Sequence, residues 1–192
     1  MKQQIARIIK ESIEIKEKIL KKNAVEIEEI ARQIIDAYKK KNKVVVFGNG
    51  GSAADAIHLA AELVARFQKE RQGLEAVALP SNISLITAIA NDYGFEKVFS
   101  RQVESLVKKG DVVIGISTSG NSKNVNLAIK QAKKQGAVTV GWTGENGGEL
   151  KHITDYCIRI PSNSTPRIQE GHVMVLHILC SLVENELFPE NK

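Results

Sequence analysis

From residue 43 onward, short apolar segments alternate with longer amphipathic ones, and this alternation restricts the possible folds more than any other feature of the chain. The apolar segments read as strands buried on both faces of a parallel sheet, and the amphipathic ones as helices that cover it. The expected strands are 44–47, 76–79, 111–116, 137–142 and 156–160, and the expected helices are 53–67, 81–90, 122–135 and 168–188. The pattern predicts a doubly wound α/β fold whose ligands bind beyond the carboxyl ends of the strands.

The residues before this alternation carry two apolar stripes. One consists of Ile5, Ile8, Ile9, Ile13 and Leu20, and the other of Ile27, Ile30, Ile34 and Ile35. Charged residues lie opposite, which predicts a pair of amphipathic helices that pack on the sheet or on another subunit. At this length we expect a single domain over residues 1–192, with the helical pair at 1–42 and the sheet core and C-terminal helix at 43–192.

The composition, with 43% hydrophobic and 26% charged residues, is that of a globular protein. No apolar run approaches the ~20 residues that a membrane span needs, and the start of the chain lacks the pattern of a secretion signal. We therefore expect a cytoplasmic protein without a membrane partner. The net charge of +5 admits an anionic substrate or nucleic acid. Because the N-terminal lysines are interleaved with glutamates at helical spacing, a solvated helix face is favoured, and no nucleic-acid partner is expected.

A glycine-rich turn, Gly-Asn-Gly-Gly-Ser-Ala at 48–53, follows the first expected strand and opens the next helix. It matches the loose dinucleotide pattern G-x-G-x-x-A, but the next strand ends in Ala-Leu-Pro-Ser at 78–81, without the acidic residue that holds a ribose. The backbone amides of the turn can instead hold oxygens of an anionic or polyhydroxylated ligand. The alternative is that the glycines serve only to make the turn tight.

The turn after the third strand, Gly-Ile-Ser-Thr-Ser-Gly-Asn-Ser at 115–122, is rich in hydroxyl groups. Its glycines have the spacing of a nucleotide-binding loop, but Asn121 stands where that loop has its lysine, which argues against a nucleoside triphosphatase. Four hydroxyls at a helix N-terminus suit one compact phosphate monoester. Helix capping, the alternative, needs only one of them.

Two histidines and a glutamate lie at spacings that a metal site allows. His58 and Glu62 are four residues apart, so they share a helix face as a hydrogen-bonded pair or as two metal ligands. Gln169 and His177 are about 12 Å apart along the last helix, and one ion reaches both only with extended side chains or across different subunits. A lone histidine in an apolar helix is more often a core residue. Spacing alone leaves these alternatives open.

Four strings of the chain form a more specific signal together than any of them alone. They are Gly-Asn-Gly-Gly-Ser at 48–52, Ala-Asn-Asp-Tyr-Gly-Phe at 90–95, Gly-Ile-Ser-Thr-Ser-Gly-Asn-Ser at 115–122 and Arg-Ile-Gln-Glu at 167–170. In this order and spacing they resemble the phosphoheptose isomerases of the sugar isomerase (SIS) family, from about residue 5 to the end of the chain. The resemblance implies an SIS fold, a homotetramer and an aldose–ketose isomerase that converts sedoheptulose 7-phosphate, a phosphorylated seven-carbon sugar, to D-glycero-D-manno-heptose 7-phosphate in heptose biosynthesis.

The resemblance also implies the residues of the site. The phosphate is expected at Ser117, Thr118, Ser119 and Ser122, and the sugar at Asn49, Gly50, Gly51, Ser52, Glu62, Asn91, Asp92 and Gln169. One zinc ion per subunit is expected at His58, Glu62, Gln169 and His177. The chain departs from some family members at Thr165 and Pro166, because those members have an acidic residue just before the Arg-Ile-Gln-Glu string. One candidate sugar contact or base is therefore missing.

The residue types at these positions fit the implied reaction. Aldose–ketose isomerisation moves a proton between adjacent carbons through an enediol, which requires a base and an acid. We expect Glu62 as the base and His177 as the acid, with zinc polarising the carbonyl. Because Glu62 cannot be a free base while tightly ligated, its metal bond must be weak or exchangeable.

Three other functions remain open. A non-catalytic SIS scaffold that binds a replication-initiator protein also resembles the chain, around 85–92 and at 186–189, but that relative lacks counterparts of Glu62 and His177. A regulator that senses sugar phosphates usually adds a DNA-binding domain, and the first 40 residues show no recognition-helix turn. An isomerase of a pentose or hexose phosphate is the third, because nothing in the sequence measures the length of the pocket.

Overall fold

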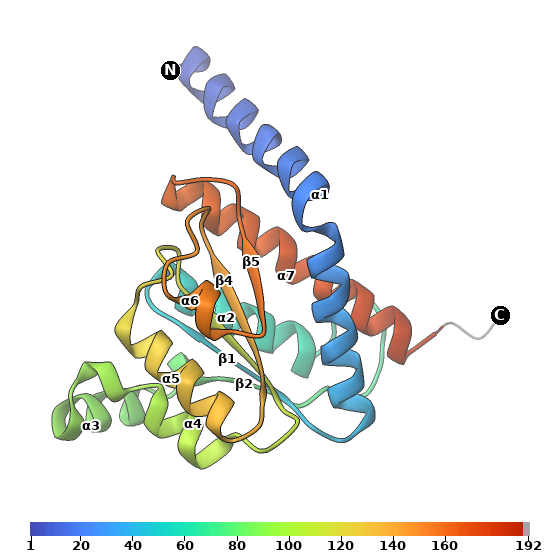
Figure 1. Cartoon of the computed structure of the whole chain (residues 1–192). Helices are drawn as coiled ribbons and strands as arrows, with labels where there is room; N and C mark the ends of the chain where they lie inside the picture. Colours follow the sequence, from blue (N-terminus) through green and yellow to red (C-terminus); the bar gives the residue numbers. More distant parts are fainter. Residues whose placement is uncertain (190–192) are drawn as a thin grey trace.

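Five parallel strands form one sheet in the order β2-β1-β3-β4-β5 in a computed structural model of the chain, which describes residues 1–189 (Figure 1). The strands are β1 Val44–Gly48, β2 Ala76–Ala78, β3 Val112–Ile116, β4 Val138–Thr143 and β5 Tyr156–Arg159. Each strand predicted from the sequence is confirmed, and its ends lie within one residue of the expected ones. The last three residues of the expected domain, 190–192, lie outside the described part of the chain.

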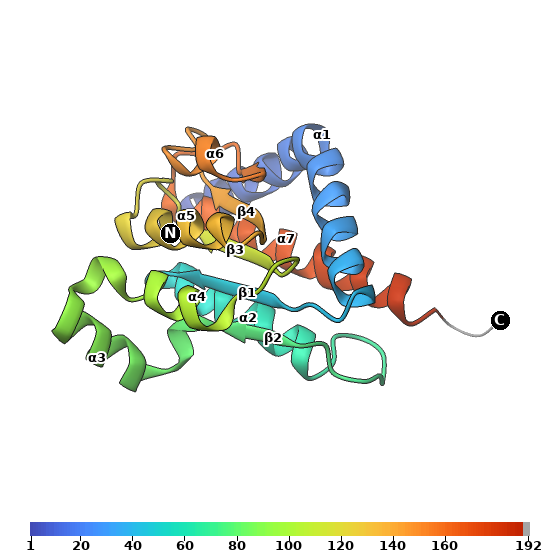
Figure 2. The ribbon, with the colours of Figure 1, turned by 60° about the horizontal axis from the view of Figure 1, so that its bottom comes forward.

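Helices cover both faces of the sheet. They are α1 Lys2–Lys39, α2 Gly51–Val64, α3 Ile83–Tyr93, α4 Ser100–Leu106, α5 Lys123–Lys134, α6 Leu150–Ile153 and α7 Thr165–Leu187. One apolar cluster joins α1, α2 and α7 to one face, and a second joins α4 and α5 to the other (Figure 2). The sequence pattern does not predict α4 or α6, because seven and four residues are too few to show a helical period. Over residues 1–189, no helix is long and apolar enough to cross a membrane.

Successive side chains of β1 point to opposite faces of the sheet, as the pleat of a strand requires. Val44 and Val46 join the cluster with α1, α2 and α7, whereas Val45 and Phe47 join the cluster with α4 and α5. All four are fully buried. Burial on both faces explains the nearly continuous apolar run of this strand and confirms the doubly wound α/β fold.

The strand order reverses its direction between β1 and β3. β2 lies on one side of β1 and β3 on the other, and the carboxyl ends of the two central strands are in register, with Gly48 beside Ile116. The helix that follows β1 covers one face, and the helix that follows β3 covers the other. The two turns therefore diverge from adjacent strand ends, which is where folds of this type bind ligands.

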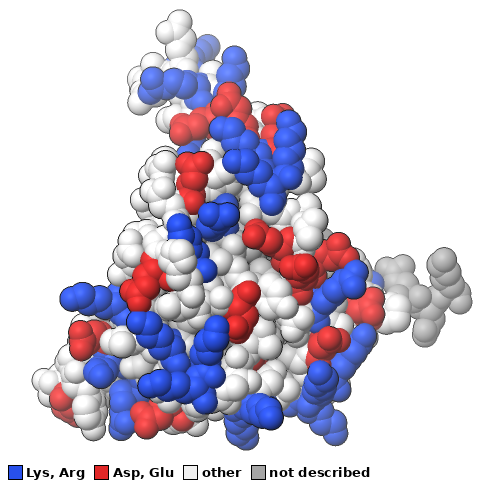
Figure 3. Space-filling view, viewed as in Figure 1, with Lys and Arg blue, Asp and Glu red and all other residues white. Residues whose placement is uncertain are grey.

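The N-terminal region is one continuous helix, α1, and the pair of helices expected from the two stripes is not formed. A buried row runs through Ile15, Ile19, Asn23, Ile27 and Ile30, and the polar residue in its middle hides the continuity in the sequence. No proline or glycine interrupts the segment. The first half of α1 extends away from the sheet (Figure 1), and basic and acidic side chains are interleaved on its surface (Figure 3).

A buried carboxylate ties the loop after α2 to the last helix. Glu184, near the end of α7, accepts four hydrogen bonds. The donors are the backbone N–H groups of Phe67, Gln68 and Lys69, at 3.2, 2.9 and 3.0 Å, and Nε of Arg71, at 3.0 Å. Burial by itself raises the pKa of this carboxyl, but the hydrogen bonds outweigh it and lower the pKa below its ordinary value. Glu184 therefore holds the loop as a carboxylate.

Replacing Glu184 by alanine leaves the Arg71 charge and three backbone donors buried without their acceptor. We expect the free energy of unfolding, measured by urea denaturation, to fall by about 3–5 kcal/mol. Glu186→Ala is the matched control on the same helix, because Glu186 pairs with Lys39 at 3.3 Å on the surface, where a loss of at most about 1 kcal/mol is expected. Equal losses in the two variants would contradict this assignment.

His172 of α7 is fully buried against the end of β4. Its Nε2 lies 3.2 Å from the carbonyl oxygen of Thr143, and its ring packs on Trp142 with centroids 5.9 Å apart. Burial lowers the pKa of His172 to about 4, because the charged form is costly away from water. The ring is therefore neutral at pH 7, and Nε2–H donates to the carbonyl of Thr143.

The depressed pKa of His172 makes stability fall in mild acid. Below the ordinary histidine pKa of about 6.5, the unfolded chain binds a proton that the folded chain refuses, which costs about 1.4 kcal/mol per pH unit. The loss ends as pH reaches the folded pKa of about 4. His172→Gln keeps an N–H donor and does not titrate. The wild type should lose roughly 2 kcal/mol of unfolding free energy relative to the variant between pH 6.5 and pH 5. A difference between the two proteins that stays constant with pH would show that His172 does not contribute to acid sensitivity.

Candidate active site

The turn after β1 opens α2 and is shaped by two glycines. Gly50 has a φ of 55°, a left-handed conformation that suits glycine. At Gly51 a side chain would collide with the amide of Gln169, which lies against it from α7. The amides of Asn49 and Asn124 exchange two hydrogen bonds of 2.9 Å, which join the turn to the start of α5. These contacts hold the first backbone amides of α2 at the edge of the sheet where ligands bind.

The turn after β3 gathers its hydroxyl groups at the start of α5. Oγ of Ser117 lies 2.9 Å from Oγ of Ser122 and 3.4 Å from Oγ of Ser119. Thr118 and Ser119 line a cavity of about 310 Å³ that extends to the loops after β4 and β5. Among the described residues that line it, Glu145 is the only charged one. The turn therefore offers hydroxyl donors and a helix N-terminus to a compact anion, without a lysine or an arginine.

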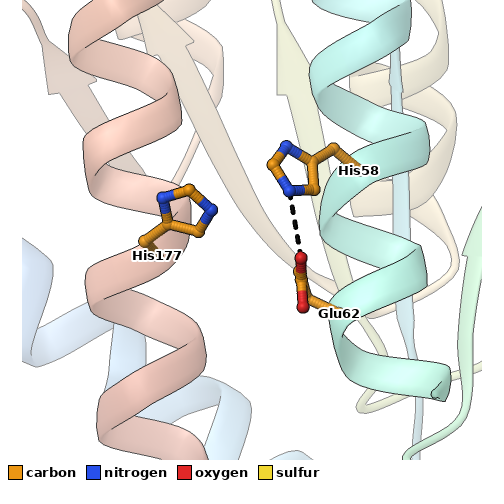
Figure 4. Close-up of side chains that lie close together, drawn as sticks. All are labelled: His58, Glu62 and His177. Carbon is orange, nitrogen blue, oxygen red and sulfur yellow. Dashed lines mark hydrogen bonds and ion pairs between the residues drawn. The ribbon is translucent and has the colours of Figure 1, made fainter. Parts of the chain in front are cut away.

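Three side chains from two helices meet where α2 and α7 run side by side. His58 and Glu62 of α2 and His177 of α7 point into the space between the helices (Figure 4). Nε2 of His58 lies 3.0 Å from Oε1 of Glu62, and ligand atoms of all three residues lie within 4.8 Å of one another. The side chains of His58 and Glu62 are 39% and 24% exposed, so solutes reach them. Two partly exposed imidazoles and a carboxylate form a donor set that fits zinc.

The ring of His177 is fixed by two aromatic neighbours. It meets the ring of His58 edge-on, with centroids 5.1 Å apart, and stacks on Phe67, with centroids 5.7 Å apart and planes 22° apart. The backbone N–H of Phe67 donates to Glu184, so the carboxylate that pins the loop also holds this ring. Phe67 is absent from the predicted site, because nothing in the sequence links the end of one helix to the face of another.

The structure places Gln169, the fourth expected ligand, at the other end of the helix pair. Its amide lies against Gly51, which precedes His58 by seven residues, about 10 Å along α2. On α7 itself, Gln169 precedes His177 by about 12 Å. Three of the four expected ligands thus meet, and Gln169 lies beside the turn after β1.

The remaining expected sugar contacts are placed differently. Ser52 is buried in the first turn of α2. Asn91 and Asp92 are exposed near the end of α3, where the amide of Asn91 donates to Asp92 at 2.8 Å. No residue of α3 is buried, and the helix lies at the periphery in both views (Figures 1 and 2). Within one chain, Asn91 and Asp92 therefore do not join the turns after β1 and β3.

Asp55 is a buried acid that the sequence pattern does not single out. It lies one helical turn before His58 on α2, and its Oδ2 has no hydrogen-bond partner within the described residues. Burial raises the pKa of Asp55 to about 6, and His58 opposes the shift. The available signal was a single acid inside an otherwise apolar first half of the helix.

Comparison with known proteins agrees with this geometry. A family model described as SIS domain matches residues 8–144. The chain is 52% identical to the phosphoheptose isomerase of Clostridium acetobutylicum, over 99% of this chain and 98% of that protein. It is 50% identical to that of Trichlorobacter lovleyi, over 96% and 94%. The solved phosphoheptose isomerase of Neisseria gonorrhoeae superposes with a TM-score of 0.91 at 38% identity, and the match covers 96% of this chain and 98% of that one.

These matches extend beyond a shared fold. They cover nearly the whole length of both chains at identities far above those of proteins that share only a fold. They include the two polar turns and the helices that carry the His58, Glu62 and His177 cluster. The chain therefore belongs to the phosphoheptose isomerase family of SIS-domain proteins.

Proposed function

We propose that the protein is an aldose–ketose isomerase that converts sedoheptulose 7-phosphate to D-glycero-D-manno-heptose 7-phosphate for heptose biosynthesis in the cytoplasm. The observation that carries this proposal is the meeting of His58, Glu62 and His177 on the helix pair that begins at the ligand-binding turn. Isomerisation through an enediol requires a base and an acid, and a metal bound by the same residues would stabilise the negative charge that develops on the oxygen. Relatives named phosphoheptose isomerase over nearly the full length support the choice of substrate.

The phosphate of the substrate is assigned to the turn after β3. The hydroxyls of Ser119 and Ser122 lie 3.4 and 2.9 Å from the hydroxyl of Ser117, and Thr118 lines the adjoining cavity. The start of α5 adds the positive end of a helix dipole. The sugar then extends toward the turn after β1, with Asn49, Gly50, Gly51 and Ser52.

We assign His58, Glu62 and His177 as residues that hold one zinc ion per subunit. Gln169 completes the expected ligand set only if its side chain extends along α7 or comes from another subunit. Bound there, zinc supplies Lewis-acid stabilisation of the negative charge that develops on the carbonyl oxygen of the sugar.

Glu62 and His177 are the proposed base and acid. The hydrogen bond to His58 engages Oε1 of Glu62, and Oε2 is the oxygen proposed to take the proton from the sugar carbon when the bond of Glu62 to the metal is released. The ring of His177, fixed by stacking on Phe67, faces Glu62 from the opposite helix, where it can donate a proton to the oxygen atom of the substrate. A positioned base and acid within one cluster match the enediol pathway.

We further propose that the protein works as a homotetramer. Ile5, Ile9 and Ile13 on the extended half of α1 are each about half exposed, which is a stripe of apolar surface that another subunit would cover. A neighbouring subunit would also be the source of Asn91 and Asp92 at the sugar, since their own chain holds them at its periphery.

The non-catalytic scaffold, the alternative considered from the sequence, finds no support. A scaffold has no need of Glu62 and His177 facing each other, and the relatives compared above are named as isomerases.

Conversion of the heptose phosphate tests the proposed reaction directly. Sedoheptulose 7-phosphate is incubated with protein stripped of metal by a chelator and with the same protein resupplied with zinc, and the products are followed by phosphorus and proton NMR. We expect the aldoheptose phosphate only after zinc is returned. Absence of conversion in both samples would contradict the proposed reaction, and full conversion by stripped protein would contradict the role of the metal.

Glu62→Gln keeps the volume and an oxygen acceptor but cannot take up a proton. We expect turnover to fall by roughly 10²- to 10⁴-fold, while inorganic phosphate, measured by calorimetry, still binds at the turn after β3. Glu70→Gln is the control, because Glu70 is an exposed glutamate that pairs with Arg66 on the surface. Wild-type turnover in Glu62→Gln would exclude this residue as the base.

A further inference from the structure

Two residues of the Arg-Ile-Gln-Glu string have no part in the proposed chemistry, yet both contact α1. Arg167 is only 8% exposed, and its Nη1 donates to the carbonyl oxygen of Ile8 at 2.9 Å. Its Nη2 pairs with Oε1 of Glu170. The other carboxylate oxygen of Glu170 accepts from Oγ of Ser12 at 2.7 Å. The first turn of α7 is thus joined to α1 at two points, one helical turn apart on α1.

Gln169 lies between these two residues in the sequence but on a different side of the helix. Arg167 and Glu170 are three residues apart and share the face toward α1. Gln169 is turned by about 100° from Glu170 around the axis, and its amide lies against Gly51. The first turn of α7 therefore bridges α1 and the turn after β1, where the sugar is expected.

The partly buried Arg167–Glu170 pair joins the two helices at a cost in folding free energy. The guanidinium of Arg167 lies at the N-terminal end of α7, where the helix dipole disfavours a cation. Its Nε is buried and has no hydrogen-bond partner within residues 1–189. Further along, the same helices share one apolar cluster, to which Ile27 of α1 and Leu179 of α7 belong, and no charge is buried there. Departures of this kind from low-cost packing are concentrated at functional sites.

We propose that Arg167 and Glu170 are positioning residues that act on the substrate through Gln169. Held by Ser12 and the carbonyl of Ile8, they fix the rotation of the first turn of α7, and this keeps the amide of Gln169 against the turn after β1. The inference rests on the proposed function, because it assigns substrate binding to that turn.

The metal-ligand cluster does not depend on this arrangement. His177 lies seven residues beyond Glu170, about 10 Å along the helix. Its neighbours Leu176 and Leu179 are buried in the core and fix that part of α7 independently. Loosening the start of α7 should therefore weaken substrate binding and leave His58, Glu62 and His177 in place.

The test uses variants that remove single hydrogen bonds. Glu170→Gln removes the charge that pairs with Arg167, and Ser12→Ala removes the donor to Glu170. Ser12→Thr is the conservative variant, because it restores a hydroxyl. Glu104→Gln is the matched control, since Arg101 and Glu104 form an Arg–Glu pair with the same spacing on the exposed face of α4. Ser12 is partly exposed, so its alanine variant is expected to fold.

The readouts are KM and kcat for the heptose phosphate, zinc retained against a chelator, and amide hydrogen exchange in segment 50–54 without substrate or metal. We expect KM to rise about tenfold in Glu170→Gln and Ser12→Ala, with faster exchange in that segment and zinc still held by His58, Glu62 and His177. The double variant should be no worse than Glu170→Gln alone, because both changes break one network. Ser12→Thr and Glu104→Gln should match the wild type.

Wild-type KM and wild-type exchange in Glu170→Gln would overturn the inference, and so would equal changes in Glu104→Gln. Failure of the proposed function gives a different result. If the wild type converts no heptose phosphate, that function is wrong, whereas the exchange in segment 50–54 still decides whether Arg167 and Glu170 position the turn.

Discussion

The packing of α2 alongside α7 is the constraint on which the rest of the site depends. Gly51 meets Gln169 at the beginning of the two helices, His58 and Glu62 meet His177 in the middle, and the loop after α2 binds Glu184 at the end. These contacts occur in the same order along both helices. A ligand beside this pair therefore meets groups whose separations are set by helix geometry and not by flexible loops.

The sheet explains why the polar turns and the helix pair belong to one site. Because β1 and β3 are neighbours with their carboxyl ends in register, the glycine-rich turn and the hydroxyl-rich turn begin side by side. The amides of Asn49 and Asn124 join the two turns directly. One turn continues into α2, so a substrate bound at the hydroxyl groups, as proposed, would lie at the entrance to the helix pair. The described lining of the cavity contains no lysine or arginine. In the proposed binding mode, hydroxyl groups and the dipole of α5 would therefore hold the phosphate without a positively charged side chain.

Features that depend on local pattern could be predicted from the sequence, and features that depend on packing could not. The strands were predictable because burial on both faces leaves a nearly unbroken apolar run, as in β1. The single helix α1 was missed because Asn23, a buried polar residue, interrupts the visible stripe. The pairing of His58 with Glu62 follows from spacing, but the approach of His177 and Phe67 depends on how two distant helices pack. The position of Asn91 and Asp92 on an exposed helix was equally invisible, since a motif does not state which surface its residues occupy.

The rigid helix that carries Gln169 and His177 also limits how this chain can vary in length. Adding or deleting one residue between them would turn one side chain by about 100° relative to the other and shift it by about 1.5 Å. Gln169 and His177 would then face different neighbours, and either Gly51 or His58 would lose its partner. Insertions and deletions between Gln169 and His177 would therefore disrupt the site. The loops at the amino ends of the strands carry no such constraint on their length.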